Sequence, residues 1–579
     1  MHAVAGALNR FLLLAGVGLI VGLTGGLYLP FIANPPVFDD LGFFSGRLFS
    51  YYATHPFGLE LRVPPYFSLA VVQVIWGTME AHRILGLALH IACSLALYKL
   101  ILDLLRHSAK PAGAPSAAGL ETYVPAFISA AVFAIHPVAV YGAGYLIQRM
   151  SVIATLFSLI SIVLYLRGLT RRSHTDAVSA AVIYSIAVLS RESAVMLPAA
   201  AVAAGLIVAA ERRFALRHVT IYLACCVPAA ALVTFLVKTK IGATYEPDFE
   251  VVSAQIAQAG GATAILDSPW LESALTQAGL FFRYLALWIL PDTDFMSIDL
   301  RVDFVEAWPP GMALLAAAGF VGYGLLGLHF LLRGGRFRLA GFGLLFPWIL
   351  FLPEFTTIRF QEPFVLYRSY LWAPGWIVLL AVALTRVPGR AVAVFAFFAL
   401  PLLFYQAHDR LRTFSNGLAL WEDAVEKLPR VAVPGGSRTL YILGREYLYR
   451  NQADRAVAVA ERCLAEYPGT YDCHMARASI HLHLDEYRQA IPHFARAILL
   501  RPESGIARHN IGVALENLGC LDEAREQYRL ASKLRFQGAV HRLSRLDSPG
   551  SGLLPPVDPK RRTDACGKPL PGGAAPPRG

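Results

Sequence analysis

The sequence predicts an all-α protein in which a polytopic bundle of membrane helices is followed by a solenoid of paired helices. The first observation is composition: 56% of the 579 residues are hydrophobic and 16% are charged, whereas soluble domains carry about 25% charged residues. The second is a series of apolar segments long enough to cross a bilayer. The third is a 34-residue period near the C-terminus.

Length and hydropathy of the apolar segments predict about eleven membrane spans. The first covers residues 11–32, and Pro30 ends it. No small-residue cleavage site followed by a soluble mature domain is visible, so we interpret this segment as a retained span rather than a signal peptide. The other spans are expected at 83–104, 122–136, 141–167, 177–190, 194–210, 219–237, 311–332, 339–357, 369–385 and 391–406.

The charges between these segments predict the orientation. Cytoplasmic loops are enriched in Lys and Arg, and the arginine-rich loops all fall on one side if the N-terminus is cytoplasmic. We interpret the segment 276–291, which contains Arg283, as a re-entrant or interfacial helix on the opposite face. The C-terminal region then lies outside the cytoplasm. The Ala- and Arg-rich composition suggests a bacterium, so we expect a multi-pass inner-membrane protein with periplasmic repeats. The arginine-rich loops begin near Arg106, Arg167, Arg212, Arg333 and Arg386.

The net charge of +11 does not indicate nucleic-acid binding, because its Arg and Lys residues are scattered in short clusters between apolar runs. The seven cysteines lack C-x-x-C spacing, which argues against a zinc site. We therefore expect contact with membrane lipid and no nucleic-acid partner.

A tetratricopeptide pattern follows the last apolar segment. Small residues and prolines recur every 34 residues, as expected for paired helices that approach closely and end at a proline. Such arrays usually bind peptides in their groove. Cys463 and Cys473 lie close enough in sequence for a disulfide to be possible in an oxidising compartment. The recurring residues are Gly444, Ala478 and Gly512; Ala456, Ala490 and Ala524; and Pro468 and Pro502.

These observations divide the chain into four parts. We expect a transmembrane domain over 1–407, a linker helix over 408–436, and repeats over 437–538. The repeats are placed at 437–470, 471–504 and 505–538. A disordered tail rich in Pro and Gly is expected over 539–579.

Polar residues gather on the expected extracytoplasmic side. Arginine matches phosphate oxygens with a rigid fork of donors, and a neighbouring aspartate could act as a general base or hold a divalent cation. Charged groups near bilayer depth usually face a water-filled cavity. The set comprises Asp39, Asp40, Arg62, His136, Gln148, Arg149, Arg191, Glu192, Arg359, Glu362, Tyr367, Arg368 and Tyr370.

Each of these residues also has a plainer interpretation. Arg149 could be an interfacial anchor whose charge reaches toward water. Glu192 and Arg191 could form a local ion pair, and His136 could cap a helix before Pro137. Asp39 and Asp40 could belong to a solvated turn.

The order of several motifs resembles a known family. The motifs are Val37 to Asp40, Phe133 to Pro137, Tyr145 to Arg149, Leu189 to Ser193 and Tyr367 to Leu371, followed by the repeats. Together they resemble the transmembrane and tetratricopeptide-repeat O-mannosyltransferases and their bacterial relatives, within the GT-C glycosyltransferase superfamily. The resemblance runs from about residue 8 to 538. Tyr141 stands where eukaryotic members usually have an acidic residue, and Arg62-Val63-Pro64 replaces their commoner Arg-Pro-Leu.

The resemblance implies an inverting enzyme that moves a sugar from a polyprenyl-phosphate-type donor to a Ser or Thr hydroxyl of a secreted or surface protein bound by the repeats. It implies that Asp39 or Asp40 carries the catalytic carboxylate, with a slight preference for Asp40. Arg149 and Arg368 would correspond to the family's arginines. Together with Arg62, which the gathered polar residues add, they would bind the donor phosphate. His136, Gln148, Arg191, Glu192 and Tyr370 would support them, and any divalent cation would lie at Asp39 and Asp40. The alternatives are a GT-C transferase acting on a glycan or lipid, and a non-enzymatic membrane scaffold.

Overall fold

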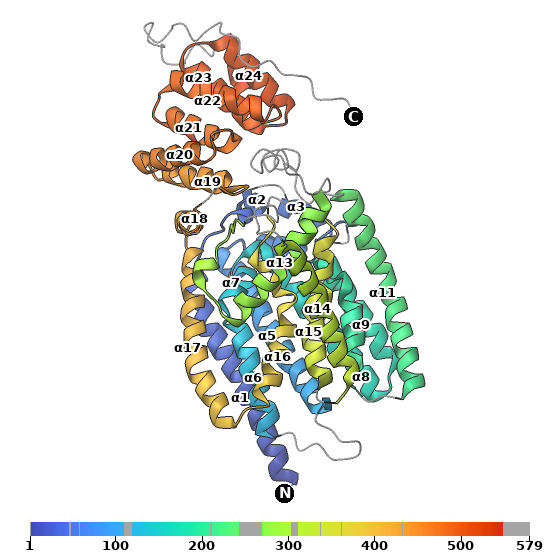
Figure 1. Cartoon of the computed structure of the whole chain (residues 1–579). Coiled ribbons are helices and arrows are strands. Elements are labelled where there is room, and N and C mark those ends of the chain that lie inside the picture. The colour runs from blue at the N-terminus through green and yellow to red at the C-terminus, as the bar shows by residue number, and fades with distance from the viewer. Residues whose placement is uncertain are drawn as a thin grey trace. The chain divides into compact units, whose positions relative to one another are not determined.

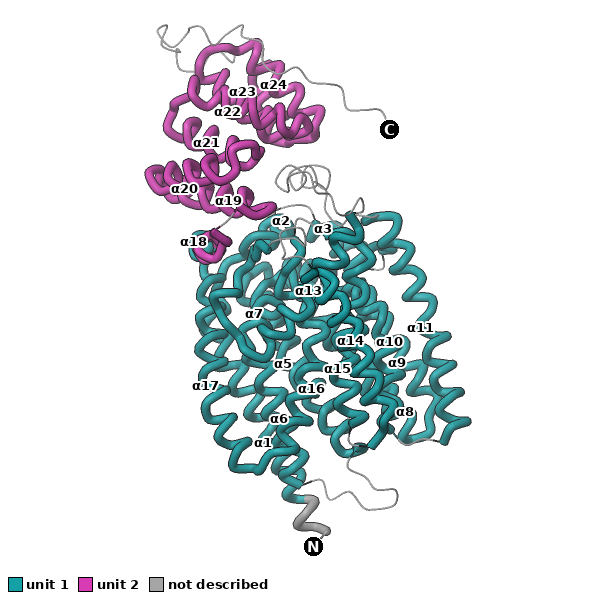
Figure 2. The backbone as a smooth tube through the Cα atoms, viewed as in Figure 1, with its two compact units in different colours: residues 1–420 teal, residues 421–579 magenta. Residues whose placement is uncertain are grey.

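The computed structural model describes residues 2–45, 48–56, 58–108, 119–208, 211–241, 269–302, 311–335, 337–359, 362–430 and 432–547. The regular elements described there are α-helices and short 3-10 helices (Figure 1). The chain forms two compact units, residues 1–420 and 421–579 (Figure 2). Each unit is described by itself below.

Unit 1 is a bundle of long apolar helices. Seven described segments are long and apolar enough to cross a membrane. An eighth results if the bent pair α6 (Leu120–Ala134) and α7 (Pro137–Ala143) counts as one span. The chain is therefore a multi-pass membrane protein by the length and composition of its helices. The seven are α1 (His2–Tyr28), α5 (Met79–Ser108), α8 (Arg149–Arg171), α11 (Arg212–Lys240), α14 (Met312–Arg333), α15 (Phe337–Phe351) and α17 (Gly389–Thr413).

The predicted number of about eleven spans is larger than the seven or eight that meet these criteria. Three predicted spans correspond to the shorter helices α9 (His174–Ser190), α10 (Leu197–Gly205) and α16 (Ala373–Leu384). Hydropathy correctly indicated that these segments are apolar. It did not indicate where each helix begins and ends. For example, α9 stops at Ser190 and the chain turns through the 3-10 helix η3 (Glu192–Met196) before α10 starts.

Two further helices belong to unit 1. The segment interpreted as re-entrant or interfacial forms α13 (Pro269–Ile289), which is not among the seven candidate spans. The apolar helix α4 (Val63–Ile75) was not predicted. It starts with prolines at its first turn, where the missing N–H costs nothing.

The break between α6 and α7 follows from a local sequence signal. The two helices are bent by 62°. His136, which precedes Pro137, is extended with φ −69° and ψ 133°, as expected because a proline disfavours the helical conformation in the residue before it. Its Nδ1 atom accepts the backbone N–H of Val138 at 3.3 Å. His136 is thus the N-cap of α7.

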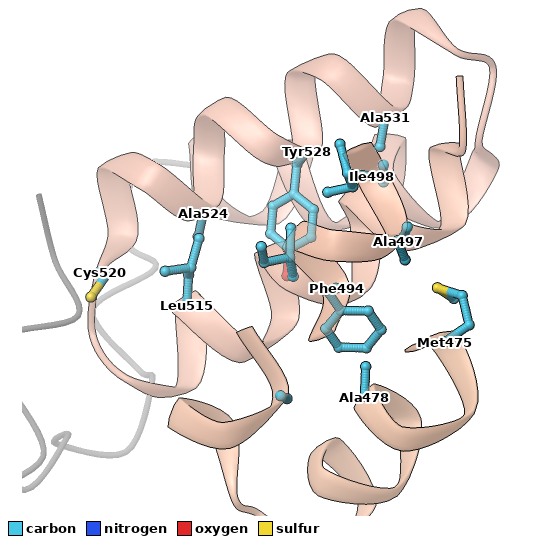
Figure 3. Close-up of a cluster of buried hydrophobic side chains, with 14 of the residues drawn as sticks. Met475, Ala478, Phe494, Ala497, Ile498, Leu515, Cys520, Ala524, Tyr528 and Ala531 are labelled. Carbon is cyan, nitrogen blue, oxygen red and sulfur yellow. The ribbon is translucent and has the colours of Figure 1, made fainter. Parts of the chain in front are cut away.

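Unit 2 contains the repeats. Pro468 and Pro502 each follow the end of the second helix of a pair, at Glu466 and Leu500. Ala456, Ala490 and Ala524 are fully buried, so the small residues lie where the helices pack. The aromatic rings of Phe494 and Tyr528 fill the core (Figure 3). The pairs are α19 (Gly436–Tyr449) with α20 (Ala453–Glu466), α21 (Tyr471–His483) with α22 (Tyr487–Leu500), and α23 (Gly505–Asn517) with α24 (Leu521–Lys533).

A disulfide joins Cys463 at the end of α20 to Cys473 in α21, with 5.3 Å between the Cα atoms. The bond that the sequence left as a possibility therefore links the first repeat to the second. It closes a short loop with a sequence separation of 10 residues.

Two helices extend across boundaries that were expected from the sequence. The linker was expected to begin at 408, whereas α17 continues to Thr413, with Arg410 and Leu411 buried in its last turns. A separate helix, α18 (Gly417–Glu426), follows. The tail was expected from 539, but helix α25 (Gln537–Asp547) covers its first residues.

Helix α25 is held to the last repeat by apolar and charged contacts. Ala539 and Leu546 are buried in the core of unit 2. The carboxylate of Glu516 accepts hydrogen bonds from Arg542, Arg545 and Tyr528. The remainder of the expected tail, from Ser548 onward, lies outside the described residues.

Candidate functional site: a polar cavity with an apolar wall

Unit 1 contains a cavity of about 670 Å³. Its lining comes from α2 (Asp39–Ser45), the turn before α8, η3, the end of α11 and the segment 352–368. Segments far apart in the sequence therefore meet there, at the end of unit 1 where α2 and α3 (Leu48–Thr54) lie (Figure 1). The charged and polar lining residues include Asp39, Arg62, Gln148, Arg191, Glu192, Lys238, Glu354, Arg359, Glu362, Tyr367 and Arg368.

The two adjacent aspartates have different environments. Asp39 is exposed and lines the cavity, and its backbone N–H donates to the Tyr145 hydroxyl at 3.0 Å. Asp40 is fully buried. Its carboxylate accepts the backbone N–H of Ile147 at 2.8 Å and that of Val37 at 3.2 Å. Asp40 therefore holds the loop in place, and of the two aspartates Asp39 is the one that lines the cavity.

Burial raises the pKa of Asp40 to about 6, although the charge of Arg83 and the two backbone N–H groups act in the opposite direction. Desolvation penalises the charged form of a carboxyl group. Asp40 is thus a carboxyl group whose ionisation is costly in the folded protein.

Arg83 fixes the same loop from the other side, and sequence reasoning did not single it out. Its guanidinium donates to three main-chain carbonyl groups, at 3.1 Å to Asn34, at 2.8 Å to Pro35 and to Gly144. Its position in the first turn of an apolar span was the available signal, because charged residues in such places need polar partners.

Arg62 and Glu192 form a paired group on the cavity wall. Nη2 of Arg62 lies 2.7 Å from Oε1 of Glu192, and Nε lies 3.3 Å from Oε2. This two-point contact is the geometry that guanidinium and carboxylate groups favour. Arg62 is the N-cap of α4 and has φ 64°, a conformation that is uncommon for a residue with a side chain.

Arg191 is buried to more than nine-tenths and also lines the cavity. Its guanidinium donates to the hydroxyl groups of Ser193 at 3.2 Å and of Ser151, and to Oε1 of Gln148 at 3.4 Å. The ring of Tyr367 lies 5.6 Å from the guanidinium carbon. Gln148 and Arg191, which were predicted as supporting residues, therefore contact each other.

Two further arginines share one carboxylate. Oε2 of Glu354 lies 2.9 Å from Nε of Arg359 and 3.6 Å from Nη1 of Arg368. All three side chains are almost fully buried and line the cavity. Sequence reasoning missed Glu354 because it ends an apolar segment that was interpreted entirely as a span.

One wall of the cavity is apolar. It is formed by the last turns of α11, through Val233, Val237 and Ile241, with Met196 from η3. The cavity therefore combines guanidinium and carboxylate groups with a hydrocarbon surface, an arrangement that suits an amphiphilic ligand with an anionic head.

Three predicted site residues lie elsewhere in unit 1. Arg149 donates to the carbonyl oxygen of His82 at 2.8 Å and to the Ser68 hydroxyl at 3.4 Å, and it is not among the cavity-lining residues. His136 stacks on Trp288, with ring centroids 4.3 Å apart. The hydroxyl of Tyr370 lies 2.6 Å from Nδ1 of His90. None of these three residues is among the cavity-lining residues.

The aspartate pair does not form a cation site by itself. Each carboxylate oxygen of Asp40 accepts a backbone N–H group, and Asp40 is fully buried and does not line the cavity beside Asp39. Among the residues that the structure describes, no three His, Cys, Asp or Glu side chains gather as metal ligands. We therefore derive no step through a metal ion.

Comparison with known families identifies the repeats. Residues 441–487 and 484–535 match the family model described as tetratricopeptide repeat, in agreement with the helix pairs of unit 2. No curated protein matches the chain significantly. The chain is thus a membrane protein that carries tetratricopeptide repeats.

Proposed function

We propose that the chain is a membrane glycosyltransferase that moves a sugar from a polyprenyl-phosphate-type donor to a Ser or Thr hydroxyl of a secreted or surface protein. The observation that carries this proposal is one cavity in which Asp39 stands with four guanidinium groups and an apolar wall. A lipid-linked sugar phosphate has matching parts: a hydrocarbon chain, an anionic phosphate and a sugar that needs an activated acceptor.

The chemistry needs only groups present in the cavity. The acceptor oxygen attacks the anomeric carbon on the face opposite the phosphate, and its proton passes to the Asp39 carboxylate. The bond between the anomeric carbon and the phosphate oxygen breaks, and the polyprenyl phosphate leaves with the electron pair. Cavity arginines stabilise the negative charge that develops on the leaving phosphate. The sugar is transferred with inversion.

Orientation with the cavity outside the cytoplasm is part of the proposal. It is supported by the arginine-rich loops, which predict cytoplasmic ends for the spans. The Cys463–Cys473 disulfide in unit 2 also supports it, since disulfides persist mainly in oxidising compartments such as the periplasm. In this orientation the repeats share a compartment with secreted acceptors, and they would raise the local concentration of a bound acceptor.

The experiment compares the extracellular glycoproteins of a deletion strain complemented with wild-type protein, Asp39→Asn or Asp103→Asn. Mass spectrometry should show sugar-modified Ser or Thr peptides with the wild-type chain and with Asp103→Asn, a control whose carboxylate pairs with Lys99 on α5. Asp39→Asn, present at wild-type level, should lose them. Undiminished modification by an Asp39→Asn/Asp40→Asn double variant would overturn the proposal. Loss of a modified lipid or glycan instead would indicate the alternative acceptor class.

A further inference from the structure

The cations of the cavity differ in how their charge is balanced. Arg62 contacts Glu192 at two points, and Arg359 and Arg368 share Glu354. The hydrogen bonds and the ring contact of the Arg191 guanidinium are to neutral groups: two serine hydroxyls, the Gln148 amide oxygen and the face of the Tyr367 ring. Among the described residues, no carboxylate lies within ion-pair distance of the Arg191 guanidinium, although the charges of Glu192 and Glu354 act on it from farther away.

The burial of Arg191 makes the lack of a contacting carboxylate energetically important. Arg191 is 7% exposed, and an unpaired charge in a low-dielectric environment is costly unless a counter-charge is supplied. The surrounding hydroxyl and amide oxygens satisfy some of its donors but do not cancel its charge. The charges of Glu192 and Glu354 act on Arg191 only from beyond ion-pair distance. A negative charge in direct contact can come from a ligand in the cavity, because Arg191 belongs to the lining.

The guanidinium is also held in one orientation. Nε donates to Ser193, and Nη1 donates to Ser151 and Gln148. In the described part of the chain, Nη2 is the guanidinium nitrogen of Arg191 that has no hydrogen-bond partner. The backbone of Arg191 is extended between α9 and η3 and its N–H donates to Ala187 at 3.1 Å. A cation fixed in advance loses little entropy when an anion binds.

From these observations, and resting on the proposed function, we infer that Arg191 is the principal anchor for the anionic phosphate of the lipid donor. Arg359 and Arg368 lie in the same cavity and contribute the second cationic group, partly neutralised by Glu354. Arg149, which the family resemblance would assign to the donor phosphate, instead lies against His82 and Ser68 outside the lining. The hydrocarbon chain of the donor would lie along Val233, Val237 and Ile241.

The test measures binding of two probes to the full-length protein in detergent: farnesyl phosphate and farnesol, which share the hydrocarbon chain but differ in charge. The wild-type protein should prefer farnesyl phosphate. Arg191→Gln should weaken farnesyl phosphate binding about 10- to 100-fold, as expected for the loss of a charged hydrogen-bonding partner. Farnesol binding should not change, which shows that the cavity is intact. Arg167→Gln is the matched control, because Arg167 pairs with Asp176 and is not a lining residue.

Arg191→Lys keeps the charge and loses the fork, and its farnesyl phosphate affinity should lie between those of the wild type and Arg191→Gln. If Arg191→Gln also loses farnesol binding, its cavity is not intact and Arg191→Lys is the variant to compare. Weaker farnesyl phosphate binding by Arg191→Lys, with normal farnesol binding, supports the inference. Wild-type farnesyl phosphate affinity in either variant overturns it. If phosphate binding depends on Arg191 but no glycosyl transfer is found, the anion site stands and the proposed function fails. If transfer is found but binding is independent of Arg191, the function stands and this inference fails.

Discussion

The Asp40 carboxylate accepts the backbone N–H of Ile147 at 2.8 Å and thereby fastens the loop after α1 to the turn before α8. Its second oxygen accepts the N–H of Val37. This buried side chain positions the neighbouring Asp39 at the cavity without lining the cavity itself.

Replacing Asp40 by alanine should destabilise unit 1. Two backbone N–H groups would lose their acceptor in the interior, at about 1–3 kcal/mol for each unsatisfied group. Thermal unfolding of the detergent-solubilised protein should show a clearly lower midpoint for Asp40→Ala. Asp103→Ala should remain near wild type, since its exposed pair with Lys99 contributes little. Equal midpoints for the two variants would contradict the assigned role.

The raised pKa of Asp40 predicts a pH dependence of stability. Its folded-state pKa of about 6 lies above the ordinary value of 3.8, so the folded state binds the proton more tightly than the unfolded state. The contribution of Asp40 to the free energy of unfolding is therefore most favourable below about pH 4. It falls as the pH rises toward 6, by about 3 kcal/mol in total.

The Asp40→Asn variant should lack this slope because it cannot ionise. Between pH 4 and pH 7, the unfolding midpoint of Asp40→Asn should therefore rise relative to that of the wild type as the pH increases. A difference that is constant over this range would show that Asp40 does not titrate there.

Arg62 and Glu192 should be energetically coupled. Their side chains are 22% and 17% exposed, so the pair is only partly screened by water, and we expect a coupling free energy of about 1–3 kcal/mol. A double-mutant cycle with Arg62→Gln and Glu192→Gln measures it through unfolding midpoints. The Lys99–Asp103 pair, cycled in the same way, should give less than about 1 kcal/mol. Additive single substitutions at 62 and 192 would argue against the pairing.

Equivalent glycines of the repeats should respond oppositely to alanine. A Cβ atom at Gly512 would lie 2.8 Å from Cε1 of Tyr528, whereas nothing lies within 4 Å at Gly444. Gly444→Ala should stabilise α19 by up to about 1 kcal/mol through helix propensity, and Gly512→Ala should destabilise unit 2 by about 1–3 kcal/mol through overpacking. Limited proteolysis of unit 2 in the full-length protein can rank the two variants. Similar protection of both would show that Tyr528 moves aside freely.

The disulfide between Cys463 and Cys473 should stabilise the repeats by about 2–3 kcal/mol, as the chain-entropy model gives for a loop this short. A Cys463→Ser/Cys473→Ser variant should be cleaved faster by protease in unit 2 than the oxidised wild type. Peptide mapping without reduction should recover the linked pair from protein made in cells, if the repeats face an oxidising compartment. Recovery of both thiols in reduced form would contradict the proposed orientation.

The repeats and the membrane class could be predicted from sequence because each depends on a periodic signal. A 34-residue recurrence of small residues directly reports helix packing, and apolar length reports a span. The number of spans could not be obtained in this way, since α9, α10 and α16 are apolar but short. Where a helix ends depends on turns such as the one after Ser190.

The cavity was only partly predictable for a geometric reason. Gln148 and Arg149 are neighbours in sequence, but successive residues at a helix start point in different directions, so Gln148 lines the cavity and Arg149 does not. The same applies to Asp39 and Asp40. The sequence was enough to predict which segments lie on the same side of the membrane. Which side chains of those segments line the cavity could be seen only in the folded structure.

Arg83 has a consequence for how this architecture tolerates change. Its guanidinium contacts carbonyl groups of the main chain at Asn34, Pro35 and Gly144, so the side chain at a position such as Pro35 takes no part in that contact. A lysine at position 83 would retain the charge but could not supply the same planar set of donors. Substitutions should therefore be tolerated more readily at Pro35 than at Arg83. A single side chain, that of Arg83, holds two loops that are far apart in the sequence.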